Sequence, residues 1–211
     1  LRSVKPMDKK YSEYEWFVHY PINNYNVTLY AGDFVCFTDT FENTNDKYPI
    51  DYYVLPHNLE KAKKYYSVTK EIVSAYEKFY GEYPFRNDGM GMVEAPFAGM
   101  EHQGAIAIGD GYGERERGYY EKPGYDYLLI HETAHEWWGN AVTMGDMADA
   151  WISESFTTYT ESLFTEQKFG YPEYIESISK NMQNTRNIWP MVGNRDVNEN
   201  TFIGNDIYSK G

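Results

Sequence analysis

The stretch YLLIHETAHEWWGN constrains the fold most, because an apolar run leads directly into the pattern H-E-x-x-H. His131 and His135 lie four positions apart, so on a helix their imidazoles face the same side, one turn apart. Glu132 lies one residue further round, where its carboxylate can reach a water held between the histidines. Three fixed residues are a weak signal, since a charged turn of an ordinary helix has the same letters. We therefore predict a helix here, with a metal site and a charged or core-satisfied helix face as its two interpretations.

The length and composition limit the classes of protein to which the chain can belong. The chain has 211 residues, of which 42% are hydrophobic, so it is long and apolar enough for a sizeable core in one domain or in one domain and part of another. A single cysteine excludes an intrachain disulfide framework. That residue, Cys36, lies in the alternating run DFVCFTD, where we expect a small buried hydrophobe. No apolar run reaches the roughly 20 residues that a membrane span needs.

The formal net charge is −13, which argues against nucleic acid or an anionic membrane surface as the main partner. An acidic chain suits a cationic group such as a metal ion or an ammonium. Solubility alone is the simpler explanation of the same charge. The sequence does not indicate a cellular compartment.

The predicted secondary structure changes along the chain, from mainly strands to mainly helices. Strands are expected at 14–22, 25–39, 50–56, 89–96 and 104–110, with a glycine-rich charged loop at 109–126. Helices are expected at 58–79, from 127 through the H-E-x-x-H motif, at 151–168 and at 172–189. Strands followed by helices predict an α+β fold, with a small mixed sheet beside a helical lobe.

A third candidate ligand lies on the next predicted helix. Catalytic zinc takes three protein ligands and keeps a fourth position open. Glu154 lies 18 residues beyond His135, and an antiparallel pair of helices can return its carboxylate to the histidines. Glu161 lies about two turns further along the same helix, where it either supports a ligand or faces solvent.

Three motifs in order resemble one family. HETAHEWWGNAVT followed by DAWISE resembles the H-E-x-x-H-x-W-x-G-N-x-V-T and D-x-W-x-x-E patterns of the gluzincin zinc aminopeptidases, which include aminopeptidase N and the leukotriene-A hydrolases. Upstream, FAGMEHQGA resembles the family's G-x-M-E-N exopeptidase motif, and downstream IYSKG resembles its Y-x-K-G motif. The resemblance covers roughly residues 12 to 211.

This resemblance implies a zinc-dependent aminopeptidase that hydrolyses the first peptide bond of peptides with a free N-terminus. One zinc ion would be held by three residues: His131, His135 and Glu154. Glu132 would be the general base, Tyr208 would stabilise the oxyanion, and Glu101 would bind the substrate's α-ammonium. Ala98 and Gly99 would let the peptide backbone approach, while packing or support of the zinc helices is implied for Trp137, Asn140, Asp149 and Trp151.

The sequence departs from the family pattern at three positions. His102 stands where the motif glutamate is usually followed by Asn, and Ala98 precedes the glycine of that motif. Ser155 stands where Gly is common after the third ligand. We expect His102 to pack or to form a hydrogen bond rather than to compete for metal, because it has no partner at helical spacing.

The family's architecture predicts two domains. Residues 1–48 would be the last strands of an N-terminal β-saddle domain, and residues 49–211 a thermolysin-like catalytic domain. The chain begins without Met, and we interpret it as a piece of a longer protein that lacks the family's C-terminal helical domain. A thermolysin-type zinc endopeptidase and a non-catalytic scaffold relative are the alternative functions, and the same zinc site leaves an epoxide-hydrolysing side activity open.

Overall fold

The computed structural model describes residues 2–109, 111–112, 125–188, 190–192 and 206–210, and all structural statements refer to these residues. Most of the predicted glycine-rich loop at 109–126 therefore lies outside the described part of the chain. No described helix is long and apolar enough to cross a membrane.

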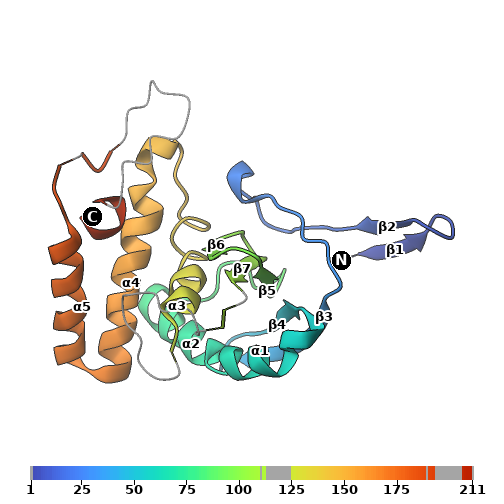
Figure 1. Ribbon diagram of the computed structural model, residues 1–211, viewed down its shortest axis with the longest axis horizontal. Coiled ribbons are helices and arrows are strands. Elements are labelled where there is room, and N and C mark those ends of the chain that lie inside the picture. Colours follow the sequence, from blue (N-terminus) through green and yellow to red (C-terminus); the bar gives the residue numbers. More distant parts are fainter. Residues whose placement is uncertain (1, 110, 113–124, 189, 193–205, 211) are drawn as a thin grey trace.

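A mixed sheet forms the centre of the molecule (Figure 1). Its order is β3 (Val35–Glu42), β4 (Lys47–Val54), β5 (Met90–Ala95), β7 (Ile106–Gly109) and β6 (Gly99–Met100). β4, β5 and β7 run parallel, whereas the two outer strands pair antiparallel with their neighbours. The short strand β6 is an edge of the sheet, so the strand that begins with Gly99 has one unpaired side. This arrangement confirms the predicted α+β class with its mixed sheet.

The prediction that Cys36 is buried is wrong, because its thiol is exposed. β3 is the other edge of the sheet, and its side chains alternate between the two faces with period two. Phe41 is buried on the inner face, five residues and therefore an odd number of positions from Cys36. The cysteine accordingly faces outward with the threonines of the same strand.

The predicted helix at 58–79 is two helices, α1 (Leu59–Tyr66) and α2 (Thr69–Tyr80), interrupted at residues 67 and 68. Asn58 occupies the position before α1, as expected, but its side chain does not cap the helix. Its amide donates instead to the buried carboxylate of Glu94 on β5, at 2.7 Å. The apolar spacing continues across the break, and for that reason periodicity alone predicted one helix.

The helical lobe consists of α3 (Tyr127–Ala134), α4 (Trp151–Phe169), α5 (Tyr171–Asn184) and the short α6 (Asp206–Ser209). Figure 1 places α3 between the sheet and α4, with α5 beyond α4. A tyrosine-rich core joins the sheet to this lobe: Tyr76 on α2 is fully buried and donates to the backbone carbonyl of Ile130 on α3, at 2.8 Å. The helix α3, which carries His131 and has His135 as its C-cap, thus packs against α2 and also contacts α4 and the sheet strand β7.

The N-terminal segment contains a separate hairpin, β1 (Ser3–Pro6) with β2 (Ser12–Glu15), followed by a 3-10 turn, η1 (Asn24–Asn26). The strands predicted at 14–22 and from 25 to 34 do not form, apart from Tyr14 and Glu15 at the end of β2. Aromatic and β-branched residues there have strand propensity but no neighbouring strand in the described chain to pair with.

The predicted domain boundary after residue 48 falls inside β4, which pairs with β3 along its length. Division into two domains stays a prediction, and this pairing favours a boundary before Val35.

Candidate metal centre and substrate site

The sequence of α3 fixes where the two histidines point. Asp126 caps the helix by accepting from the backbone N–H of Leu128 at 3.0 Å, and the helix ends at Ala134 with His135 as its C-cap. His131 and His135 therefore lie one turn apart at the end of a buried helix. Their Nε2 atoms are 3.0 Å from each other, so both imidazoles face one point, as the spacing predicted.

Glu154, in the first turn of α4, completes the group. Its Oε2 lies 3.4 Å from Nε2 of His131 and 3.5 Å from Nε2 of His135. All three side chains are buried, and their ligand atoms lie within 4.8 Å of one another. The pKa of Glu154 is lowered well below its usual value: burial alone would raise it, but the charges of the two histidines outweigh burial.

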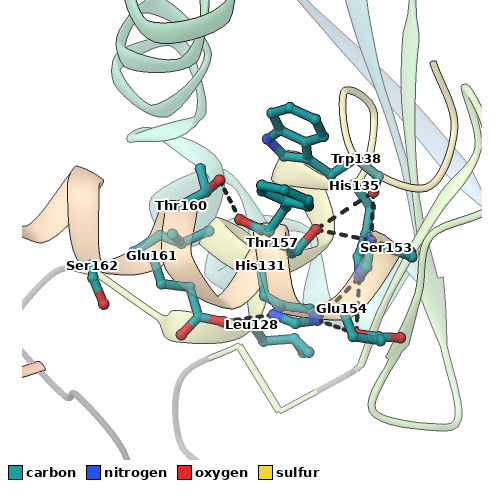
Figure 2. Close-up of polar contacts among 12 residues, drawn as sticks. Leu128, His131, His135, Trp138, Ser153, Glu154, Thr157, Thr160, Glu161 and Ser162 are labelled. Atoms are coloured by element: carbon teal, nitrogen blue, oxygen red, sulfur yellow. Dashed lines mark hydrogen bonds and ion pairs between the residues drawn. The ribbon is translucent and has the colours of Figure 1, made fainter. Parts of the chain in front are cut away.

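The other ring nitrogen of each histidine is held by a neighbour (Figure 2). Nδ1 of His131 lies 2.6 Å from Oε1 of Glu161, whose side chain is 20% exposed. Nδ1 of His135 lies 2.9 Å from the carbonyl oxygen of Trp138. Acceptors at Nδ1 keep a proton on that nitrogen, which makes Nε2 the nitrogen available to a metal ion. Of the two interpretations of Glu161, the solvent-facing one is wrong.

Two hydroxyls on α4 add to the support of His135. Ser153 Oγ and Thr157 Oγ1 each lie 3.1 Å from its Nδ1. Gly139 makes room for this contact: its φ is +111°, and a Cβ there would overlap the Ser153 hydroxyl and lie 3.2 Å from the same ring nitrogen. A side chain at Gly139 would therefore push against the ligand from behind.

These residues fit a zinc ion, which the resemblance implies. Two imidazole nitrogens and one carboxylate oxygen are the donor set of a catalytic zinc site with an open fourth position. The ligand atom Oε2 of Glu154 is buried and has no hydrogen-bond partner among the described residues, and the same is true of Oε2 of Glu132. Buried carboxylate oxygens without partners are costly unless a cation or a proton satisfies them.

Glu132 lies beside the three candidate ligands. Burial raises its pKa to about 7, against the opposing effect of the histidine charges. A carboxyl group with a pKa near 7 can both accept and release a proton at neutral pH. Glu101 approaches from the sheet side: ligand atoms of Glu101, Glu132 and His135 also lie within 4.8 Å of one another. Thus three carboxylates meet the histidines in one small volume.

The residues around Glu101 follow the edge of the sheet. Ala98 accepts from the backbone N–H of Gly109 at 2.8 Å and leads into β6, which begins at Gly99. A Cβ on Gly99 would overlap the Glu132 carboxylate and lie 2.8 Å from a methyl group of Leu128. The missing side chain at Gly99 therefore leaves space for Glu132, a use of this glycine that the sequence did not suggest.

Tyr208 lies on α6, close to the candidate metal ligands. Its ring centroid is 6.3 Å from that of His131. Burial, followed by the charges of Glu154 and Glu101, raises the pKa of its hydroxyl, so the phenol remains a proton donor. The hydroxyl of Ser155, directly after Glu154, donates to the backbone carbonyl of Ile207 next to the tyrosine. Ser155, where the family pattern commonly has Gly, thus connects α4 to α6.

His102 forms a hydrogen bond, as expected for a residue outside the metal group. Its Nδ1 lies 2.6 Å from the hydroxyl of Tyr30, and the two rings meet edge to face with centroids 5.7 Å apart. It belongs to neither group of candidate ligands in the described chain. Trp137 is buried, with its indole N–H donating to the carbonyl of Gly81. Trp151 and Tyr208 pack against the same small apolar cluster.

Sequence reasoning missed several contributors. Ser153 and Thr157 flank Glu154 on α4 at i−1 and i+3, and the combination of hydroxyls around a ligand was a signal that could have been used. Glu136 is fully buried and accepts from the hydroxyl of Tyr83 at 2.7 Å and the backbone N–H of Gly104 at 3.0 Å. These two partners are distant in sequence and gave no local signal.

Comparison with known proteins places this arrangement in a family. The Peptidase family M1 domain matches residues 64–208, more than half of the chain. Aminopeptidase N of Streptomyces lividans is 32% identical over 148 residues, which are 67% of this chain and 17% of that protein. Tricorn protease-interacting factor F2 of Thermoplasma acidophilum is 29% identical over 188 residues, which are 81% of this chain and 24% of that protein. The chain thus spans at most about a quarter of the length of these curated relatives.

Solved structures share the fold. Yeast LTA4 hydrolase superposes with a TM-score of 0.63 at 17% identity, over 84% of this chain and 35% of that chain. An M1 zinc metallopeptidase from Deinococcus radiodurans superposes with a TM-score of 0.56 at 20% identity, over 75% of this chain and 34% of that chain. The domain match, the relatives and the fold agree with the motifs and with the geometry around His131, His135 and Glu154. The chain therefore belongs to peptidase family M1.

Proposed function

We propose that this protein is a zinc-dependent aminopeptidase that removes single residues from the free N-terminus of peptides. The observation that carries the proposal is the position of Glu101, whose carboxylate lies with Glu132 and His135 inside one 4.8 Å group. A carboxylate this close to the candidate metal ligands can bind the substrate's α-ammonium and so place the first peptide bond over the metal. The names of the M1 relatives, such as aminopeptidase N, support the same activity.

The role proposed for each residue follows from the chemistry of its side chain. His131, His135 and Glu154 would hold one zinc ion, which when bound polarises the scissile carbonyl and lowers the pKa of its water to about 7. Glu132 would accept the proton of the attacking water and deliver it to the leaving amine. The Tyr208 hydroxyl would donate to the oxygen that becomes negative in the transition state.

The edge strand β6 supplies a route for the peptide. Its outer side is unpaired within the described sheet, so an extended substrate can add to it through backbone hydrogen bonds. Gly99, at the start of this strand, presents no side chain to a bound peptide. Glu101 follows β6 directly, where it would stop the peptide at its N-terminal residue.

The test compares aminoacyl 4-nitroanilides that carry a free amine with their N-acetylated forms, using the full-length protein loaded with zinc. We expect the wild type to cleave the free substrates much faster, because acetylation removes the charge that Glu101 binds. Glu101→Ala should reduce this discrimination and keep its zinc, whereas the exposed-residue control Glu60→Ala should behave as wild type. Equal rates for free and blocked substrates would reject the aminopeptidase proposal.

The same measurements separate the two alternatives. A thermolysin-type endopeptidase would hydrolyse internal bonds of blocked peptides at least as well as free ones. A scaffold relative would hydrolyse neither class, with or without bound zinc. The proximity of Glu101 to Glu132 favours the aminopeptidase over both.

A further inference from the structure

The 3-10 turn η1 and the residue before it, Asn23–Asn26, reach into the site from a distant part of the chain. The described structure gives Glu101 one side-chain hydrogen-bond donor, the hydroxyl of Tyr25, which is 3.2 Å from Oε1. The two residues are 76 positions apart in sequence. Glu101 itself is 7% exposed, so few solvent molecules can take the place of that donor.

The ring of Tyr25 is held in place. It packs against a small apolar cluster of Met144, Ala150 and Ile207, and Tyr208 and Trp151 pack against the same cluster. Asn23 anchors the start of the turn, since its amide donates to Thr143 Oγ1 at 2.8 Å. Burial and the Glu101 charge both raise the pKa of the Tyr25 phenol, so it carries its proton at any working pH.

The last residue of the turn holds the backbone of Glu101. Asn26 is buried, and its amide donates to Oδ1 of Asn140. The amide of Asn140 in turn donates to the backbone carbonyl of Glu101, at 3.0 Å. Two neighbouring residues of one short turn therefore reach the same glutamate, Tyr25 at its side chain and Asn26 at its backbone through Asn140.

We propose that Tyr25 and Asn26 are positioning residues that aim the Glu101 carboxylate at the substrate's α-ammonium and so set how strongly the enzyme prefers a free N-terminus. The proposal rests on the aminopeptidase function proposed above. An unsupported carboxylate can rotate about its side-chain torsions, and a charge-assisted hydrogen bond to an ammonium requires a defined direction. The turn removes that freedom before the substrate arrives, which lowers the cost of binding.

The main test is Tyr25→Phe in the zinc-loaded, full-length protein, with Tyr171→Phe as the control, because Tyr171 is exposed and lies on α5. The ratio of kcat/KM for a free aminoacyl nitroanilide to that for its N-acetylated form should fall about tenfold, as expected for one hydrogen bond to a charged group. The loss should lie in KM for the free substrate, and the rate for the acetylated substrate should not change. General structural damage would instead lower both rates together.

A binding experiment gives a second readout that does not depend on turnover. Calorimetry should show that Tyr25→Phe weakens leucinamide binding about tenfold and leaves the binding of 4-methylpentanamide, which lacks the amine, unchanged. Asn26→Ala should act in the same direction with its zinc retained. In a Glu101→Ala background, Tyr25→Phe should have no further effect on the ratio.

The outcomes of the two proposals are distinguishable. A wild type that does not discriminate between free and acetylated substrates rejects the aminopeptidase function itself. A wild type that discriminates, together with a Tyr25→Phe variant that keeps the full ratio, rejects the positioning role alone. An effect of Tyr25→Phe that persists undiminished without Glu101 also rejects that role.

Discussion

A substitution of Glu132 is expected to separate catalysis from metal binding. Glu132 is buried beside the candidate ligands but is not one of the three, and no hydrogen bond in the described chain engages its Oε2. Glu132→Gln keeps the size of the side chain and removes its basicity. We expect stoichiometric zinc in the variant and a fall in kcat of at least about 10²-fold, the usual contribution of a general base. Metal analysis and steady-state kinetics check both parts, and loss of zinc from the variant would contradict the assignment.

A substitution at Gly139 tests how much space the side chain of His135, a candidate metal ligand, requires. The positive φ of Gly139 and the closeness of the Ser153 hydroxyl leave no place for a methyl group. Gly139→Ala should lower the free energy of unfolding by about 1–3 kcal/mol, because the backbone is strained for a residue with a side chain. It should also weaken zinc binding by displacing the imidazole. Urea denaturation and zinc titration measure these effects.

Gly145 offers the matched control. A Cβ there meets nothing within 4 Å, so Gly145→Ala should change neither quantity. If both variants behave alike, the effect at Gly139 arises from general glycine replacement rather than from the space behind His135.

At the residue scale, sequence predicted the parts of the site that have fixed local spacing. His131 and His135 share a helix face because of their separation, and Glu154 follows from the family pattern. Tyr25, Asn26 and Glu136 could not be predicted, because each acts through partners brought close only by the folded chain. Glu161 was predicted only in part. Its spacing placed it on the same helix face as Glu154, but only the structure showed that its carboxylate contacts His131 instead of facing solvent.

At the element scale, α6 is held by hydrogen bonds from the other helices of its lobe. Ser155 on α4 donates to the carbonyl of Ile207, and Thr185, just after α5, donates to that of Ser209 at 3.2 Å. A helix of four residues has little stability of its own. Its attachment to α4 and α5 therefore determines where the Tyr208 hydroxyl lies.

Tyr208→Phe in the full-length protein should raise the activation barrier by about 3 kcal/mol with little change in KM, as for loss of one oxyanion donor. Ser155→Ala should lower kcat less, because it loosens the support of the tyrosine without removing the hydroxyl. In combination the two changes should cost no more than Tyr208→Phe alone, since Ser155 acts through that hydroxyl.

Ser162→Ala is the control for Ser155→Ala, because Ser162 is another buried serine of α4 and bonds to Ser177 on α5. Its kcat should match the wild type. Additive losses in the double variant would show that Ser155 affects catalysis by a route other than Tyr208.

Helices and strands were predicted correctly where the spacing of the hydrophobic residues and the residues that end an element agree. The helix at 151–168 matches α4 almost to the residue, because Gly170 ends it, whereas Pro172 lies in the first turn of α5. The prediction of a single helix at 58–79 was wrong at its centre, because the break between α1 and α2 leaves the apolar spacing intact. The strands expected before residue 35 failed for another reason: strand propensity is local, whereas a strand requires a partner.

At the scale of the whole molecule, proton binding, zinc binding and folding are coupled. Burial works to lower the pKa of His135, but the charges of Glu101 and Glu154 outweigh it and raise the pKa from 6.5 to about 9. Burial also works to lower the pKa of His131, but its close contacts with the carboxylates of Glu154 and Glu161 outweigh burial and raise that pKa. Because the pKa of each histidine is raised in the metal-free protein, protons compete with zinc for their ring nitrogens.

The metal-free fold should lose stability as the pH rises from 6.5. A histidine whose pKa is raised on folding contributes stability that is fully present below its unfolded pKa, near 6.5, and is lost as the pH passes its folded value, about 9 for His135. Burial raises the pKa of Glu136 from 4.5 to about 7, so its contribution is lost between these two values and mostly below this range. The pKa of Glu154 is lowered, and its contribution is constant here because it is lost only in acid.

Zinc binding has the opposite pH dependence, because its ligands must be unprotonated, and a bound metal stabilises the fold by mass action. The difference in Tm between zinc-saturated and chelated protein should therefore widen between pH 6.5 and 8.5. Glu136 titrates in both forms and largely cancels in this difference. His135→Gln should abolish the widening, whereas His57→Gln, at an exposed position before α1, should preserve it. A gap that stays constant or narrows would show that protons do not compete with zinc at His131 and His135.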